Sequence, residues 1–220
     1  MNARNDPYTA QQRLVQGLEP TDFVIFDVGA YRRTTVSRYR SVLPDARVYA
    51  FEAYPESVTE LERKFGGDAF IRLVPRVIAD RPGTRAFYVN GRPATNSLLP
   101  RPVATRRYFP SDAGPRFTIE LSVTTLDEIQ GGELMALQGA GRLLSQSRSP
   151  IVFSEVLFVP LYERVPLFCE LSAHLAEYGY ALYGLYDLNF ASNGQLRFGD
   201  AIFVNESFRR DVLDRFPEEP

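Results

Sequence analysis

The stretch FVIFDVGA, residues 23–30, decides the fold of this chain of 220 residues. A continuous apolar run that ends in an acid and a glycine is typical of a parallel strand, covered on both faces and followed by a tight turn. Working outward, we expect a short helix over residues 34–42 and a second strand over 47–51, closed by Glu52. A strand, a helix and a strand in this order predict a right-handed βαβ unit in a parallel sheet.

The rest of the sequence continues this alternation. A helix is expected from Pro55 to Phe65, because proline fits a first helical turn and Gly66-Gly67 follows the last. Residues 70–79 read as one third strand. Further strands are expected over 85–89, 117–124, 151–156, 180–186 and 201–204, and further helices over 133–144 and 166–178. The expected fold class is α/β, a mostly parallel central sheet with helices on both faces and an antiparallel C-terminal strand.

The composition indicates a cytoplasmic globular protein. Hydrophobic residues make up 45% and charged residues 24%, and the net charge of -2 argues against a nucleic-acid or membrane-surface binder. The single cysteine excludes an internal disulfide, the N-terminus lacks the apolar run of a signal peptide, and no apolar run approaches the about 20 residues of a membrane span. We expect one domain over residues 1–220, with residues 1–20 as an N-terminal helical extension, and a homo-oligomer is compatible with this composition.

Two carboxylates stand at strand ends, where open α/β sheets bind their ligands. Asp27 leads into the turn Val28-Gly29-Ala30, and its carboxylate can receive an ammonium group or organise that loop. Glu52 follows twenty-five residues later and can accept both hydroxyls of a ribose. Acids that merely cap the next helices are the alternative. The pair at this spacing favours a nucleoside ligand.

A dinucleotide cofactor is the main competitor for this site. It requires a Gly-x-Gly-x-x-Gly turn, in which the pyrophosphate contacts backbone N–H groups. This chain has only Gly29, followed by Tyr31-Arg32-Arg33, and no Walker-type phosphate loop. S-adenosylmethionine has no phosphates and tolerates a poorer glycine loop, so it is favoured over the cofactor of an oxidoreductase. One histidine and one cysteine offer no metal-ligand spacing.

An ordered series of motifs resembles the FkbM family of methyltransferases. It spans about residues 22–204. The motifs are DVGA at 27–30, Thr35, RVYAFE at 47–52, Pro55, VIAD at 77–80, Gly83, FYV at 87–89, NSL at 96–98, TLDE at 125–128, QGGEL at 130–134, Leu137, GA at 139–140, SEV at 154–156, PLY at 160–162 and GDA at 199–201.

The resemblance implies a Rossmann-like methyltransferase fold with S-adenosylmethionine as cofactor. It implies methyl transfer to a small-molecule acceptor, commonly a hydroxyl of a sugar or natural-product scaffold, so we expect a carbohydrate-like acceptor. The turn from Asp27 to Ala30 would line the methionine side, Glu52 would hold the ribose, and Ala79-Asp80 would lie near the adenine. Glu155 and Asp127 are the candidate bases for the acceptor hydroxyl, chosen by position alone.

The Pro-, Arg- and Gly-rich segment over residues 90–116 is a further candidate surface. Its arginines either meet an anionic acceptor or form a solvated surface. They are Arg101, Arg106, Arg107 and Arg116.

Two departures from the family pattern stand out. The family has Asn-x-Gly where this chain has Tyr31-Arg32-Arg33, so the Arg33 side chain would intrude on the pocket or force a positive φ. The family also places a helix and a core strand between its T-L-D and Q-G-x-E motifs, which are adjacent here. A fourth parallel strand is therefore expected to be missing, unless Leu121–Ile129 fills its slot. A second hypothesis follows, a weakened or inactive relative that acts as a binding or scaffolding module.

Overall fold

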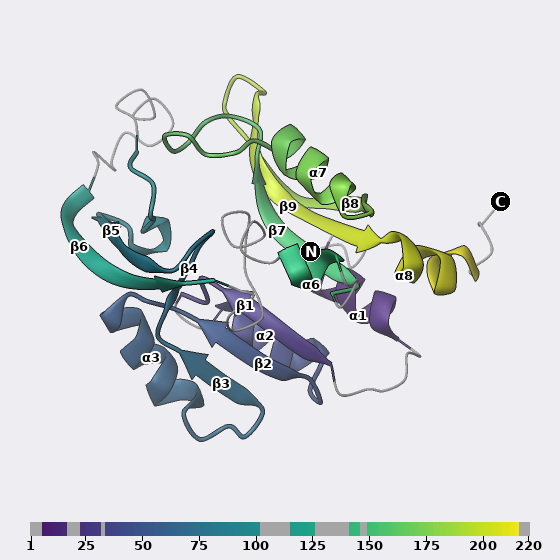
Figure 1. Cartoon of the computed structure of the whole chain (residues 1–220), viewed down its shortest axis with the longest axis horizontal. Helices are drawn as coiled ribbons and strands as arrows, with labels where there is room; N and C mark the ends of the chain where they lie inside the picture. The colour runs from purple at the N-terminus through teal and green to yellow at the C-terminus, as the bar shows by residue number, and fades with distance from the viewer. Residues whose placement is uncertain are drawn as a thin grey trace.

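The computed structural model describes residues 6–16, 23–31, 34–101, 115–125, 141–145 and 149–215. The strands are β1 Val24–Val28, β2 Arg47–Phe51, β3 Ile71–Val74, β4 Val77–Ile78, β5 Gly83–Asn90, β6 Pro115–Thr124, β7 Ile151–Leu157, β8 Tyr180–Phe190 and β9 Leu196–Asn205. The helices are α1 Pro7–Val15, α2 Thr34–Val42, α3 Pro55–Phe65, η2 Pro93–Thr95, α6 Gly141–Ser145, α7 Phe168–Glu177, α8 Glu206–Asp211 and η4 Leu213–Arg215. Helices and strands alternate from α1 to β3, whereas β3, β4 and β5 follow one another directly, as do β8 and β9 (Figure 1).

The N-terminal half forms a parallel sheet in the order β1-β2-β3. The register places Val28 beside Phe51, so β1 and β2 end at the same edge of the sheet. The crossover helices α2 and α3 cover one face, where Val36 and Leu61 pack with Ala50 in one buried cluster. The expected βαβ unit is confirmed, because an apolar strand and an amphipathic helix each bury their apolar side against the other.

Residues 70–79 form two short strands instead of the expected single strand. β3 ends at Val74 and β4 begins at Val77, and β4 belongs to a second sheet in the order β4-β6-β5. Pro75 lies between them and has no N–H for a strand ladder, which gives a physical reason for the break. In this second sheet β4 runs parallel to β6 and β5 runs antiparallel to it.

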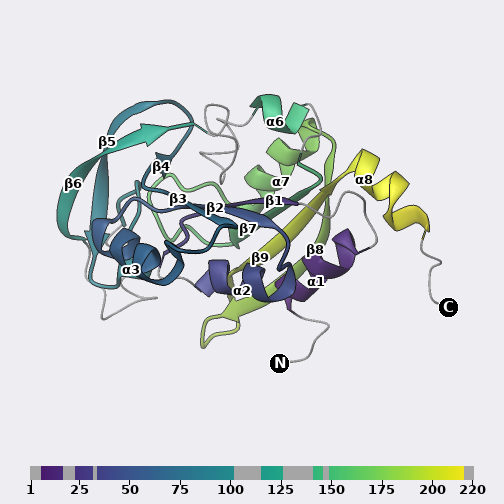
Figure 2. The same cartoon turned by 90° about the horizontal axis from the view of Figure 1, so that it is seen from below.

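The C-terminal part forms a third sheet in the order β7-β9-β8, in which both pairs are antiparallel. The expected antiparallel C-terminal strand is confirmed. Val156 of β7, Leu175 of α7 and Phe203 of β9 share a buried cluster with Phe51 of β2, so the first and third sheets share a core. Figure 2 shows α1, α2 and α3 on one side of the strands and α6 and α7 on the other.

Within the described residues, no strand lies between β1 and β7. There β1 pairs only with β2, and β7 pairs only with β9. The expectation that Leu121–Ile129 fills this slot is wrong for residues 121–124, which belong to β6 and pair with β5 and β4. The antiparallel ladder with β5 already uses the backbone groups of this segment, which explains the difference. Residues 126–129 lie outside the described ranges.

Helix α1 connects the first and third sheets. The ring of Tyr8 lies 5.1 Å from the ring of Tyr39 on α2 and 5.6 Å from the ring of Phe153 on β7, measured between centroids. Further along the same helix, Leu14 packs with Ile202 of β9. This helix is the part of the expected N-terminal extension that the structure describes.

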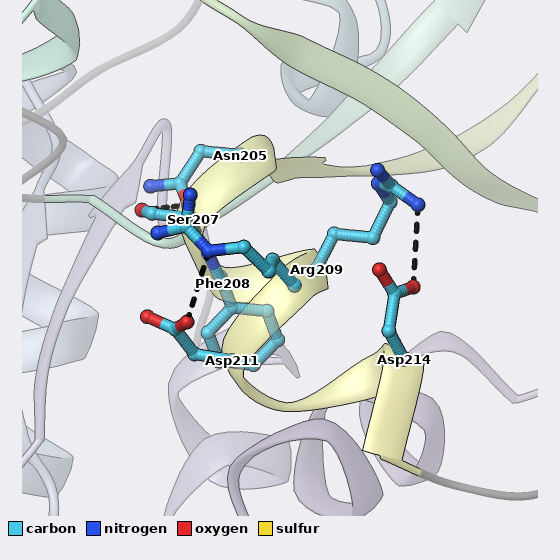
Figure 3. Close-up of polar contacts among 7 residues, drawn as sticks. Asn205, Ser207, Phe208, Arg209, Asp211 and Asp214 are labelled. Carbon is cyan, nitrogen blue, oxygen red and sulfur yellow. Dashed lines mark hydrogen bonds and ion pairs between the residues drawn. The ribbon is translucent and has the colours of Figure 1, made fainter.

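Helix α8 follows β9 and is capped by Asn205 (Figure 3). The Asn205 Oδ1 atom accepts hydrogen bonds from the Phe208 N–H at 2.8 Å and from the Ser207 hydroxyl at 2.9 Å. Arg209 pairs with Asp214 of η4 at 3.2 Å. None of the helices in the described ranges combines the length and the apolar character that crossing a membrane requires.

Candidate functional site

A cavity of 470 Å³ opens where the first two strands end. This volume lies within the about 300–1,000 Å³ that is usual for small-molecule sites. The ends of β1 and β2 form one part of its wall, and β7 with the segments around it forms another. The lining includes Val28, Gly29, Tyr31, Phe51, Glu52, Tyr54, Ser57, Arg76, Val77, Ile78, Phe87, Asn96, Ser97, Ser154, Glu155, Tyr162 and Phe168.

The turn after β1 is held by backbone hydrogen bonds to β2. The N–H groups of Gly29 and Ala30 both donate to the carbonyl of Phe51, at 2.9 and 3.0 Å. Gly29 has a φ of +75°, a left-handed conformation that favours glycine. Val28 and Gly29 line the cavity, whereas Ala30 is buried in the cluster beneath α2 and α3.

Tyr31 also has a left-handed backbone, with a φ of +46°. This conformation is costly for a residue with a bulky side chain. It lets the Tyr31 N–H donate to Oε2 of Glu52 at 2.9 Å, while the residue lines the cavity. The positive φ or intruding side chain predicted at Arg33 falls outside the described residues, and the strained backbone at Tyr31 was not predicted.

Glu52 is held by three backbone N–H groups at the end of β2. Its Oε1 accepts from Ala53 at 2.8 Å and from Tyr54 at 2.7 Å, and its Oε2 accepts from Tyr31. Burial raises the pKa of Glu52, and these three hydrogen bonds lower it, with burial prevailing. A carboxylate has about four lone-pair sites, so one remains, on Oε2. Placed in this way, Glu52 has room to accept one ribose hydroxyl rather than two.

Asp27 lies behind the turn and is not among the residues that line the cavity. Its side chain is buried and accepts a short hydrogen bond from the Thr35 hydroxyl of α2. Burial raises the pKa of Asp27 to about 6, the Thr35 bond lowers it, and the charge of Glu52 raises it further. Asp27 therefore anchors α2 to β1 and acts on Glu52 through its charge.

Glu155 reaches the cavity from β7. It is accessible to solvent there, yet enclosure by the surrounding protein raises its pKa. The antiparallel register places it directly opposite Asp200 of β9. Burial, then the charges of Glu155 and Asp187, raise the pKa of Asp200 to about 7, and Arg38 lowers it. The negative charge of Glu155 thus acts on Asp200 across the ladder. The other candidate base, Asp127, lies outside the described residues.

Ala79 and Asp80 are not among the residues that line the cavity. Ala79 is fully buried, and its N–H donates to the carbonyl of Thr124 at 3.0 Å. The carboxylate of Asp80 pairs with Arg85, and with Arg81 at 3.2 Å. Of the predicted cofactor residues, Val28, Gly29 and Glu52 therefore line the cavity, whereas Asp27, Ala30, Ala79 and Asp80 do not.

The family of the chain follows from a match over most of this region. A family model described as the methyltransferase FkbM domain matches residues 27–182, which include the cavity from the end of β1 to the start of β8. The chain belongs to the FkbM methyltransferase family. The resemblance seen in the sequence motifs is thereby confirmed.

Solved structures agree with the fold of an FkbM-family chain. The FkbM methyltransferase from Methylobacillus flagellatus superposes with a TM-score of 0.52 at 14% identity, over 91% of this chain and 48% of that one. This likeness confirms the Rossmann-like fold, and the chain spans about half the length of this relative.

Two further solved structures are less similar. They are the fibrillarin of Aeropyrum pernix with bound S-adenosyl-L-methionine, with a TM-score of 0.44 and 12% identity over 89% of this chain and 74% of that one, and a precorrin-6y C5,15-methyltransferase from Geobacter metallireducens, with a TM-score of 0.42 and 11% identity over 90% and 87%. No curated protein matches the sequence.

The segment after η2 closes the cavity of this FkbM-family chain against the loop after β7. The Arg101 guanidinium lies 5.1 Å from the ring centre of Tyr162 and donates to its hydroxyl at 3.3 Å. The Glu163 N–H donates to the carbonyl of Pro100 at 2.9 Å. Arg101 thus serves to join these two segments. Arg106 and Arg107, for which the sequence left an anionic acceptor or a solvated surface as alternatives, lie outside the described residues.

Two polar atoms that lie on lining residues are buried without a hydrogen-bond partner in the described structure. They are the Ser57 hydroxyl and the Asn96 amide nitrogen. The sequence analysis missed Ser57, although one signal was available: it is the only polar member of the buried stripe that continues with Leu61 and Phe65 on α3. The described ranges hold no group of three or more His, Cys, Asp or Glu side chains suited to a metal ion.

Proposed function

We propose that the chain binds S-adenosylmethionine in this cavity and transfers its methyl group to a hydroxyl of a small, carbohydrate-like acceptor. The observation that carries the proposal is the convergence of the Gly29 turn and Glu52 on one cavity of 470 Å³. Membership of the FkbM methyltransferase family supports it. The proposal includes a cytoplasmic location. It also includes a small-molecule partner, because the net charge of -2 does not suit a nucleic-acid partner.

The residues present fit this cofactor. The cavity has the volume of a small-molecule site, and the glycine turn lets the backbone come close to a ligand. Oε2 of Glu52 keeps one lone pair for a ribose hydroxyl, and Ser57 offers an unused hydroxyl. When bound, S-adenosylmethionine supplies an electrophilic methyl group on a sulfonium.

The chain's own residues then align the acceptor and remove its proton. Alignment of the acceptor oxygen and exclusion of water are the main contributions that a protein makes to such a displacement. Glu155 lies on the cavity wall and takes the hydroxyl proton, and its raised pKa makes it a stronger base than a glutamate with the ordinary pKa. Asn96 and Tyr162 also line the cavity, and their amide and hydroxyl groups suit an acceptor that has several hydroxyls.

Titration calorimetry with S-adenosylmethionine and S-adenosylhomocysteine tests the cofactor site. We expect Glu52→Gln to weaken both ligands at least about tenfold, because the amide cannot serve both the backbone N–H groups and the ribose. Glu62→Gln, the same change on the exposed side of α3, is the matched control and should bind as the wild type does. A wild-type protein that binds neither ligand at millimolar concentration would refute the cofactor assignment.

Turnover is tested separately with a panel of sugars and hydroxylated small molecules. We expect Glu155→Gln to keep cofactor affinity and to lose methyl transfer about 100-fold or more. Cofactor binding by the wild type without transfer to any hydroxylated acceptor would instead support the binding or scaffolding hypothesis. Equal turnover of wild type and Glu155→Gln would remove Glu155 as the base.

A further inference from the structure

Ser57 carries a buried hydroxyl that has no hydrogen-bond partner among the described residues. The residue is 1% exposed, lies in the first turn of α3 and lines the cavity. A buried hydroxyl left without a hydrogen bond costs about 1–3 kcal/mol. Native proteins rarely keep such a group unless a water or a ligand satisfies it.

The position of Ser57 on α3 is unusual for a polar residue. Ser57, Leu61 and Phe65 follow one another at a spacing of four and form the buried face of the helix. Leu61 and Phe65 pack with Ala50 in the core, whereas Ser57 stands at the end of the stripe where the cavity begins. A hydroxyl at this position is useful if the cavity holds a polar ligand atom.

The order of the strands tells which end of a nucleoside would lie near Ser57. The Gly29 turn follows β1, Glu52 follows β2, and β3 lies on the far side of β2. Helix α3 contacts β3, and Ile71 of β3 packs against the cluster that holds Leu61 and Phe65. If Glu52 binds the ribose and the Gly29 turn faces the methionine part, the base lies toward α3 and β4.

Apolar side chains surround this part of the cavity. Tyr54, Val77 and Phe87 belong to one buried cluster and all line the cavity. Such surfaces can hold the faces of a flat heterocycle, but they leave its polar edge to be satisfied by another group. Asp80, which the resemblance implied for this role, does not line the cavity and is engaged by two arginines.

We propose that the Ser57 hydroxyl forms a hydrogen bond with the polar edge of an adenine base and so selects the nucleoside part of the cofactor. The inference rests on the proposed function, since it assumes that the cavity binds an adenosine-containing ligand. It assigns base recognition to helix α3 and not to the residues after β4.

Calorimetry with S-adenosylhomocysteine and 5′-methylthioadenosine tests this role. We expect Ser57→Ala to weaken both ligands by a similar factor of about 5 to 20, because the lost contact belongs to the part that they share. The matched control is Thr59→Ala, on the same helix, whose exposed hydroxyl already donates to the carbonyl of Pro55 at 3.0 Å. Its affinities should stay within about twofold of the wild type.

Methylthioadenosine analogues that each lack one polar atom of the base locate the contact. These analogues replace N1, N3 or N7 by C–H, or the exocyclic amino group by hydrogen. For one of them, Ser57→Ala should cause no further loss, since the partner atom is already missing. An equal loss with every analogue would overturn the proposal, and so would an unchanged affinity for the two parent ligands.

Thermal unfolding of the ligand-free proteins separates recognition from a structural role. Ser57→Ala should unfold at the same or a higher temperature than the wild type, because it removes an unsatisfied hydroxyl. A lowered unfolding temperature together with weaker binding would overturn the proposal in favour of a structural serine. A wild type that binds neither parent ligand would refute the proposed function itself, and the two failures are therefore distinct.

Discussion

Asp27 is 8% exposed and lies behind the turn that borders the cavity. Burial raises its pKa from 3.8 to about 6, against the hydrogen bond from Thr35 and with help from the charge of Glu52. Below pH 3.8 the group is protonated in both the folded and the unfolded chain and has no effect on stability. Between pH 3.8 and 6 the unfolded chain releases this proton while the folded chain keeps it, so stability falls as the pH rises through this window.

We expect Asp27→Asn to raise the free energy of unfolding at pH 7 by on the order of 2 kcal/mol, because the neutral amide avoids the buried charge. Its Oδ1 can still accept the bond from Thr35. The gain should disappear near pH 3.5, and cofactor affinity should fall, since Asp27 anchors α2 behind the turn and acts on Glu52 through its charge. Urea unfolding at the two pH values and calorimetry measure these effects. An equal gain at both pH values would contradict the electrostatic cause.

The strand-end acids could be predicted from the sequence, whereas the unsatisfied hydroxyl of Ser57 and the backbone strain at Tyr31 could not. Asp27 and Glu52 end apolar runs, and a parallel register brings the ends of such runs to one edge. The strain at Tyr31 depends on a contact far along the chain, its N–H bond to Glu52, which local propensity does not report. The empty hydrogen-bond capacity of Ser57 appears only when its neighbours are placed in space.

At the scale of elements, a proline inside an apolar run explains why one expected strand is observed as two. Residues 70–79 look like one buried strand, yet Pro75 divides them between two sheets. The division carries β4 into the small sheet with β5 and β6, where Val77 and Phe87 meet at the cavity. The break in the strand thus helps to form the cavity wall, which an uninterrupted strand in the main sheet would not provide.

Helix α8 was not expected, although its sequence has the signals of a helix. Asn205 stands at the cap, Glu206 in the first turn, and Arg209 and Arg210 in the last turn, which suits the helix dipole. The helix has six residues and would be marginal alone. Its stability comes from the buried Phe208, which packs with Val204 and Ile202 of β9.

The cap of α8 gives a test at this scale. Asn205→Ala should lower the free energy of unfolding by about 1–2 kcal/mol, because the Phe208 N–H loses its partner. The Asn205 amide also donates to the carbonyl of Ser149 at 3.3 Å, and that bond is lost too. Ser207→Ala is the control, expected within about 0.5 kcal/mol, since its hydroxyl only adds to the cap. Urea midpoints compare the three proteins, and equal midpoints would show that the cap does not stabilise the helix.

The whole molecule depends on how its first and third sheets are held together. The cavity takes Glu52 from the first sheet and Glu155 from the third, and no described strand joins β1 to β7. The shared core around Phe51 and Phe203 holds the two sheets on one face. On the other face the connection is made by α1, with Tyr8 between Tyr39 of α2 and Phe153 of β7.

Removal of the Tyr8 ring therefore tests the connection between the sheets. We expect Tyr8→Ala to lower the free energy of unfolding by about 3–5 kcal/mol, the usual cost of deleting a buried aromatic ring. Tyr8→Phe keeps the ring and its contacts and should stay within about 1.5 kcal/mol of the wild type. Unfolding followed by circular dichroism and by tyrosine fluorescence measures both changes.

Tyr8→Ala should also weaken S-adenosylhomocysteine in the temperature range where the variant remains folded. The two walls of the cavity belong to different sheets. Looser contact between the sheets lets the Gly29 turn and Glu155 move relative to each other, and binding must then order them at a cost in entropy. Tyr8→Phe should bind as the wild type does, because it keeps the ring contacts with Tyr39 and Phe153. A variant with the full loss of stability and unchanged affinity would show that α1 stabilises the fold without positioning the cavity, and that the core around Phe51 suffices to hold the two walls in place.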